Sequence, residues 1–249
     1  MMKKRKAVFT IVKNEKVILP LWLKYYSKFF QPEDIYVLDH QSTDGSTDGL
    51  ACNIKIVHSD FAFDHVWLNR VVCDFQIELL REYTTVLFVE ADEFVFHKDG
   101  LDTYIDNLKI ASSRCVGFEL QHVTDKELPL NLGRPVLEQR SFWYQNPEYC
   151  KTLISKVPIH WNLGFHECDN HGRLDSDLYL VHLHRFDFDI ANQKNMARAM
   201  MKWNKFDLDN GLGFQNRIVG EQFRQWFERY RAWNVIEPIN EDLKASLAF

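Results

Sequence analysis

The feature that most constrains this chain is a regular alternation of short apolar runs with segments of helical spacing over residues 7–110. The apolar runs, each closed by polar residues, lie at residues 7–12, 35–38, 54–57 and 86–89. The helical segments lie at residues 21–30, directly after Pro20, and at residues 66–83. Parallel strands that are buried on both faces read as continuous apolar runs, so this order predicts a mostly parallel central sheet flanked by helices. The expected fold class is α/β.

The second half of the chain is less regular, and polar or proline-bearing loops separate its elements. Strand-like runs lie at residues 115–120, 138–144, 152–157 and 178–184, and helix-like segments at residues 192–206 and 221–230. No repeat, low-complexity tract or linker interrupts the 249 residues, which are enough to bury a core. We expect a single domain over residues 1–249, with an irregular, mixed C-terminal half.

Composition narrows the functional classes. The net charge of −5 argues against a nucleic-acid partner, because general nucleic-acid binders present a basic surface. The five cysteines are scattered and never form C-x-x-C, which indicates reduced thiols and a cytoplasmic location rather than disulfides or a zinc knuckle. No run of 18 apolar residues occurs, so we expect no transmembrane segment, while peripheral contact with a membrane surface stays open.

Acidic residues follow three of the predicted strands. The first strand ends near Asn14 and Glu15, the second at Asp39, and the fourth at Glu90-Ala91-Asp92-Glu93. In an open α/β sheet, ligands bind beyond the carboxyl ends of the strands. Carboxylates gathered at one edge repel each other unless a cation compensates, and Mg²⁺ or Mn²⁺ with oxygen ligands is the simplest compensation. The alternative is that such acids are solvated or cap the next helix, and this applies to Glu15 more than to Asp92.

Three motifs together resemble family 2 glycosyltransferases. V-L-D-H-Q-S-T-D-G-S-T (residues 37–47) resembles the second-strand signature of that family, and V-L-F-V-E-A-D-E-F-V (residues 86–95) its acid-x-Asp metal motif, in the variant that continues Asp-Glu-Phe. V-F-T-I-V-K-N-E (residues 8–15) resembles the first strand. The resemblance covers residues 7–96 and implies a GT-A-like fold, with residues 7–110 as the nucleotide-sugar-binding half and residues 111–249 as the acceptor-side half. Glu90 is a departure, since the family more often has Asp there.

The resemblance implies a role for each matching residue. Asp39 would accept hydrogen bonds from the donor base, Asp44 would shape the nucleotide pocket, Glu90 would face the ribose, and Asp92 would bind the Mn²⁺ or Mg²⁺ that bridges the diphosphate. Asn14 and Glu15 would belong to the same donor site, as would Lys151, which resembles a lysine on a strand that precedes a histidine in such proteins. A bound cation would stabilise the negative charge that develops on the leaving nucleoside diphosphate.

The second half contains the candidates for the remaining chemistry. His182 and His184 alternate on one predicted strand and so point to the same face, and His166 lies in a loop with two acids. We expect His166 or His182 to complete the metal shell; the alternative for each is a hydrogen-bonded core histidine. In an inverting transfer, one carboxylate takes the proton of the acceptor hydroxyl. Glu167 and Asp169 are the candidate catalytic bases, and Glu167 is preferred because it follows His166.

The expected activity is transfer of a sugar from a nucleotide-sugar donor to a hydroxyl of a carbohydrate or glycolipid acceptor, in polysaccharide or lipopolysaccharide synthesis as in bacterial relatives. One alternative is a metal-dependent hydrolase or nucleotidyltransferase that uses the same acids with the histidines. A second alternative is a carbohydrate-binding relative without catalytic activity. Asp39 favours the transferase, because a hydrolase needs no base-recognition aspartate on the second strand, and an intact Asp92 argues against the silent relative.

Overall fold

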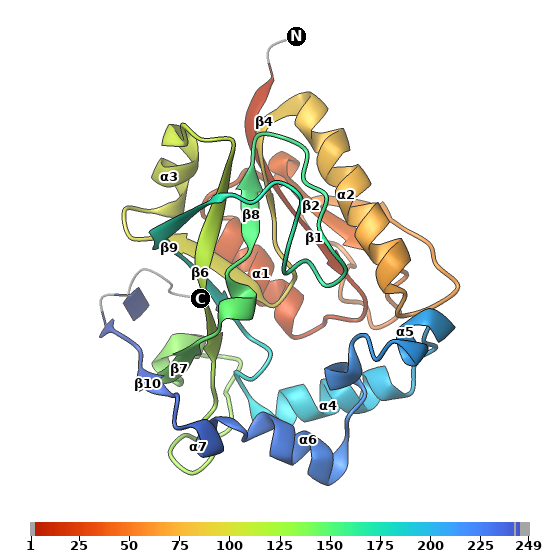
Figure 1. Ribbon diagram of the computed structural model, residues 1–249, viewed down its shortest axis with the longest axis vertical. Helices are drawn as coiled ribbons and strands as arrows, with labels where there is room; N and C mark the ends of the chain where they lie inside the picture. Colours follow the sequence, from red (N-terminus) through yellow and green to blue (C-terminus); the bar gives the residue numbers. More distant parts are fainter. Residues whose placement is uncertain (1–2, 242, 245–249) are drawn as a thin grey trace.

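Strands and helices alternate in the N-terminal half, as the sequence predicts. The computed structural model describes residues 3–241 and 243–244 (Figure 1). Its strands are β1 (Lys4–Val12), β2 (Ile35–Asp39), β3 (Asn53–Ile56), β4 (Tyr83–Phe88), β5 (Glu93–His97), β6 (Ser112–Leu120), β7 (Phe142–Gln145), β8 (Thr152–Ser155), β9 (Arg173–His182) and β10 (Glu237–Pro238). Its helices are α1 (Ile18–Tyr26), α2 (His65–Glu82), α3 (Leu101–Asn107), α4 (Phe188–Ala199), α5 (Lys205–Asp209), α6 (Gly220–Phe227) and α7 (Tyr230–Trp233).

The sheet has a parallel centre and a mixed flank. Its strand order is β10-β7-β6-β8-β4-β1-β2-β3, with β9 paired to both β6 and β5. Strands β3, β2, β1 and β4 are parallel neighbours, and Val12 at the end of β1 is in register with Asp39 at the end of β2. Beyond β4, the pairs β4–β8, β8–β6 and β6–β7 are antiparallel. The expected α/β class, with parallel strands at the centre and a mixed second half, is confirmed.

Helices cover both faces of the parallel strands. Side chains alternate between the faces of a strand, so Val8 and Val12 of β1 pack in the cluster that contains Trp22 of α1. Ala7 and Phe9, on the opposite face of β1, pack in the cluster that contains Phe75 of α2. Because both faces are buried, β1 needs apolar residues at successive positions, and this is the continuous run that the sequence shows.

Several element boundaries differ from the prediction. Strand β5 was not predicted: a tight turn, in which the Glu93 N–H donates to the Glu90 carbonyl (3.0 Å), leads from β4 directly into β5, which pairs with β9. The helix predicted at residues 192–206 is two helices, α4 and α5. Helix α4 starts earlier because the Asp187 carboxylate caps it, accepting a hydrogen bond from the Ile190 N–H (3.0 Å).

No helix within the described residues combines the length and the apolar character that a membrane span needs.

Helices α4, α5 and α6 lie beyond the ends of the parallel strands, below them in Figure 1. This arrangement brings the C-terminal part of the chain over the edge of the sheet where the acidic residues lie.

Candidate functional site

The loop after β2 is joined to the loop after β1. Asn14 has a φ of +56°, a left-handed conformation that asparagine adopts more readily than most residues. Its side-chain carbonyl accepts a hydrogen bond from the Thr43 N–H (2.7 Å), and its own N–H donates to the Ser42 hydroxyl (3.0 Å). The two loops predicted to contact the nucleotide therefore form one connected wall.

Asp39 and Asp44 both accept hydrogen bonds within this wall. The buried Asp39 carboxylate accepts from the Ser42 N–H (2.8 Å) and the Thr47 hydroxyl (3.0 Å). Asp44 accepts from the Ser46 N–H (3.0 Å) and from a backbone N–H of the loop after β1 (3.2 Å). Burial would raise the pKa of Asp44, but these hydrogen bonds outweigh it and lower the pKa. The base-binding role of Asp39 and the pocket role of Asp44 stay predictions.

Lys151 forms a partly buried ion triad with two acids that follow β4. Its ammonium lies 2.7 Å from a carboxylate oxygen of Glu90 and 2.7 Å from one of Glu93, and both Lys151 and Glu93 are buried. Glu93 also accepts a hydrogen bond from the Glu90 N–H (2.9 Å). Burial opposes the charged forms, but the mutual attraction is stronger: it raises the pKa of Lys151 and lowers that of Glu90. Lys151, predicted at the donor site, is thus placed to orient Glu90.

Asp92 lies among cations that come from the second half of the chain. Its Oδ1 is 3.7 Å from Nε2 of His182, and its Oδ2 is 3.5 Å from the ammonium of Lys194. The same ammonium lies 2.9 Å from Oε2 of Glu15, and Oε1 of Glu15 lies 2.9 Å from the Arg198 guanidinium. Burial would raise the pKa of Asp92, but the nearby cations, Lys194 first, hold it far below its usual range.

Glu119 is a member of this cluster that the sequence reasoning missed. It is fully buried, and its carboxylate contacts Nδ1 of His182 (3.0 Å), accepts from the Tyr149 hydroxyl (3.0 Å) and accepts from the Arg185 N–H (2.8 Å). Burial opposes the charged imidazole, but Glu119 and Asp92 raise the pKa of His182 to about 9. The available signal was a lone acid between Phe118 and Leu120 in the otherwise uncharged run at residues 115–120.

His184, predicted on the same strand as His182, lies instead in the turn that follows β9, which ends at His182, and it does not share the environment of His182. Its Nε2 is buried and has no hydrogen-bond partner among the residues that the structure describes, and its ring lies 5.0 Å from the Trp226 ring. Burial and the neighbouring His182 lower the pKa of His184 well below its usual value. Of the two, His182 is the one that contacts acidic side chains on both of its ring nitrogens.

The loop that contains His166, Glu167 and Asp169 is exposed. The His166 Nδ1 lies 2.8 Å from a backbone carbonyl, and the Tyr149 ring centroid lies 6.3 Å from that of His166 and 4.3 Å from that of His182. The loop therefore lies near the Asp92 cluster. The ion pairs found for Glu167 within the described residues go to Arg114 and His171 rather than to that cluster. Asp169 accepts a hydrogen bond from the backbone N–H of residue 160. Their catalytic roles stay predictions.

The residues around Asp92 fit a divalent cation that binds together with a phosphate-bearing ligand. Within the described residues, no three histidine, cysteine or acidic side chains are arranged to hold a metal on their own. Mg²⁺ and similar ions, however, bind through one or two carboxylates together with substrate phosphates. Asp92 and, once its Nε2 has lost its proton, His182 would supply two adjacent ligands, and the Lys194 ammonium already occupies a cation position between the Glu15 and Asp92 carboxylates. These side chains thus suit a cation whose remaining ligands come from a diphosphate.

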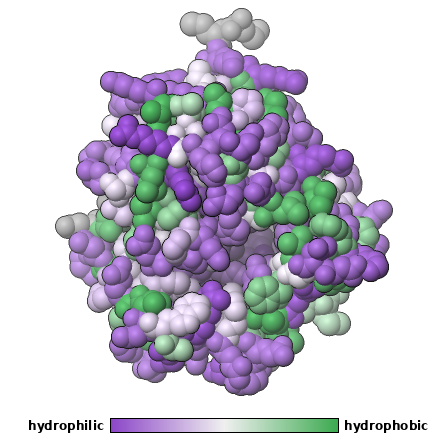
Figure 2. Space-filling view, in the orientation of Figure 1, coloured by the Kyte–Doolittle hydropathy of each residue, from purple (hydrophilic) through white to green (hydrophobic). Residues whose placement is uncertain are grey.

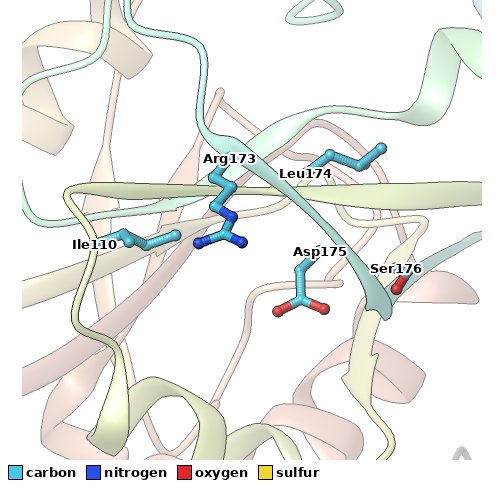
Figure 3. A pocket seen from close by; sticks show the side chains of 5 residues that line it. All are labelled: Ile110, Arg173, Leu174, Asp175 and Ser176. Atoms are coloured by element: carbon cyan, nitrogen blue, oxygen red, sulfur yellow. The ribbon is translucent and has the colours of Figure 1, made fainter.

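The surface has two hollows that lie at different distances from the residues around Asp92. Figure 2 shows a depression lined by hydrophilic residues near the middle of this face, between the sheet and helices α4 and α6. A separate cavity of about 330 Å³ lies at the start of β9, where Arg173 and Asp175 extend over the opening beside Ile110 (Figure 3). His182 is at the other end of β9, six residues beyond Ser176 of the cavity lining, which is roughly 20 Å at about 3.3 Å per residue. The cavity is therefore not part of the acidic site.

Comparison with known proteins gives distant structural likenesses. No family model and no curated protein matches the chain. A mannosyltransferase from Pyrobaculum calidifontis, solved with GDP-Man and Mn²⁺, is 18% identical over 47% of this chain, with a TM-score of 0.31. The chain spans 36% of the length of that protein.

Residues 1–349 of S. aureus TarS are 14% identical over 89% of this chain and 77% of that one, with a TM-score of 0.39. The same TarS segment in complex with UDP-GlcNAc has a TM-score of 0.38, with 14% identity and coverage of 89% and 78%. At these scores the likenesses do not assign an activity, which has to come from the site residues.

Proposed function

We propose that this chain is a divalent-metal-dependent glycosyltransferase, which moves a sugar from a nucleoside-diphosphate sugar to an acceptor hydroxyl. The observation that supports this most is the position of Asp39, Glu15 and Asp92 at the ends of three adjacent parallel strands. Neighbouring strands are about 4.8 Å apart, so the ends of β2 and β4, on either side of β1, are separated by roughly 10 Å across the sheet. One nucleotide could then contact Asp39 through its base and Asp92 through its diphosphate.

In this proposal the residues along the sheet edge bind different parts of the nucleotide sugar. Asp39 and Asp44, fixed by the wall that Asn14 completes, receive the base. Glu90, oriented by Lys151, receives a ribose hydroxyl. A divalent cation held by Asp92 and His182 would neutralise charge on the leaving diphosphate.

The acceptor chemistry belongs to the second half of the chain. Glu167, or Asp169 as the alternative, takes the proton of the acceptor hydroxyl in an inverting transfer. The hydrophilic depression between the sheet and α4 is a suitable place for a carbohydrate or a glycolipid headgroup (Figure 2). We extend the proposal to polysaccharide or lipopolysaccharide synthesis, as the motif resemblance implies.

The experiment is a thermal-shift screen of nucleotide sugars with and without Mn²⁺. GDP-Man and UDP-GlcNAc are the first probes, since they are the ligands in the similar structures. A donor at 100 times its Kd stabilises the native state by about 2.7 kcal/mol. For a chain of this length that raises the Tm by roughly 5–10 °C.

The wild-type protein should show this rise only with Mn²⁺, and Asp92→Asn should fold normally but lose it. Asp48→Asn is the matched control, because Asp48 is an exposed acid in the loop after β2. No rise with any nucleotide sugar, or an unchanged Mn²⁺ dependence in Asp92→Asn, would refute the proposal. Release of free sugar with no transfer to any saccharide would favour the hydrolase instead.

A further inference from the structure

Two basic residues on α4 face the acidic edge of the sheet. Lys194 and Arg198 are four residues apart, so their side chains project from the same face of the helix. Each side chain is only 17% exposed, and each reaches Glu15, which is distant in the sequence but lies at the end of β1. The Glu15 carboxylate, which pairs with both cations, therefore joins helix α4 to the first half of the chain.

The two cations are not equivalent. Arg198 contacts Oε1 of Glu15 and also donates to the side-chain carbonyl of Asn216, so its position is fixed from two sides. Lys194 contacts Oε2 of Glu15 and, at 3.5 Å, Oδ2 of Asp92. Lys194 thus occupies the position next to Asp92 where the proposed function requires a divalent cation, whereas Arg198 does not.

A divalent cation and an ammonium group cannot both neutralise the Asp92 carboxylate at close range. They repel each other, and the repulsion is strong where water is largely excluded. Arg198 can keep Glu15 paired if Lys194 leaves. The lysine side chain is long and flexible, with three rotatable donors, so its ammonium can change partner without movement of the helix.

We propose that Lys194 is an exchangeable cation: it neutralises Asp92 in the free protein and, when metal and donor bind, it leaves Asp92 and binds the donor diphosphate. This inference rests on the proposed function, because it requires a metal and a diphosphate at Asp92. It adds a specific claim, that Lys194 opposes binding of the metal alone and favours binding of the diphosphate. A purely structural lysine would not affect the two ligands in opposite directions.

The experiment measures two affinities in the wild-type protein and in Lys194→Met. The first is for Mn²⁺ alone, followed by the electron paramagnetic resonance signal of free Mn²⁺. The second is for GDP and for UDP at saturating Mn²⁺, followed by calorimetry. Lys205→Met is the matched control, since Lys205 is 85% exposed on α5 and pairs there with Asp209.

In Lys194→Met, Mn²⁺ alone should bind about tenfold tighter or more, by analogy with the 1–3 pKa units that one charge within 4–6 Å shifts a carboxylate. The nucleoside diphosphate should bind roughly 10–100-fold weaker, because one charge-assisted hydrogen bond is lost. Lys205→Met should change neither affinity.

In a folded variant, any other change in the two affinities overturns the inference. Weakening of both ligands would make Lys194 a structural residue, and no change in either would mean that it does not exchange. If the wild-type protein binds neither Mn²⁺ nor a nucleoside diphosphate, the proposed function fails together with the inference. If the methionine variant does not fold, as its thermal transition will show, Lys194→Gln retains a polar side chain of similar reach and takes its place in the same measurements.

Discussion

Replacement of Lys151 by methionine tests how the acidic edge is held together. Methionine keeps most of the buried aliphatic volume but removes the ammonium that lies 2.7 Å from both Glu90 and Glu93. Two carboxylates are then left beside each other without their cation. Breaking a buried ion pair in this way costs about 3–5 kcal/mol, because the remaining charge stays desolvated.

The structure places the expected cost at the lower end of that range. Glu93 is fully buried and cannot turn toward water, whereas the Glu90 side chain is 35% exposed and can. We therefore expect the free energy of unfolding to fall by about 3 kcal/mol. With a urea m-value near 3 kcal/mol/M for a chain of this length, the midpoint of unfolding should fall by about 1 M.

The pH dependence follows from the lowered pKa of Glu90. A carboxyl group whose folded pKa is lowered adds stability above its unfolded pKa, about 4.3 for glutamate, and loses it as the pH falls through the folded pKa. The difference between the wild-type protein and Lys151→Met should therefore be largest near pH 7 and shrink in acid.

Lys55→Met is the control, because Lys55 pairs with Glu78 at the same distance of 2.7 Å but both side chains are about half exposed. That exposed pair should contribute no more than about 1 kcal/mol. Equal losses for the two variants in urea unfolding, or a loss in Lys151→Met that does not depend on pH, would refute the reasoning.

Three further predictions concern single side chains. Asp39→Ala should weaken nucleotide binding by about 1–3 kcal/mol while leaving inorganic diphosphate binding unchanged in calorimetry, since its proposed partner is the base; equal losses would contradict this role. Glu167→Gln should lower turnover about 10²–10⁴-fold with donor affinity unchanged, and a large loss in Asp169→Asn alone would move the base to that residue. Burial, with help from Lys13, lowers the pKa of His40 to about 4, so the neutral ring is favoured in the folded state. Between pH 6.5 and 4 the wild-type protein should lose about 3 kcal/mol more stability than His40→Gln in pH-dependent urea unfolding, and parallel curves would contradict the assignment.

The sequence predicts the parallel centre of the sheet because the information there is local. A strand buried on both faces must be apolar at successive positions, and residues 7–12, 35–38 and 86–89 satisfy this without reference to anything else. Strand adjacency then brings the acids after β1, β2 and β4 to one edge, as expected. Asp39 and Asp92 were identified for this reason.

The partners of these acids could not be predicted in the same way. Glu15 and Arg198 are 183 residues apart, and nothing in the sequence of α4 indicates that its two basic residues, Lys194 and Arg198, face the sheet. Glu119 looked like part of an ordinary strand, although its position between two apolar residues was a usable signal. Long-range ion pairs depend on how the second half of the chain packs against the first half. A single sequence contains little information on that geometry.

The charges of the acidic edge are balanced between the two halves of the chain. The carboxylates of Glu15, Glu90, Asp92 and Glu93 all come from the first half of the chain, and the cations that contact them, Lys151, His182, Lys194 and Arg198, all come from the second. Carboxylates this close would otherwise protonate or repel each other. The interactions that join the halves are thus the ones that keep Asp92 ionised. A ligand that binds Asp92 must therefore exchange places with one of these cations, and Lys194, which is less constrained than Arg198 and is shared between two acids, is the one that can leave while Glu15 stays paired.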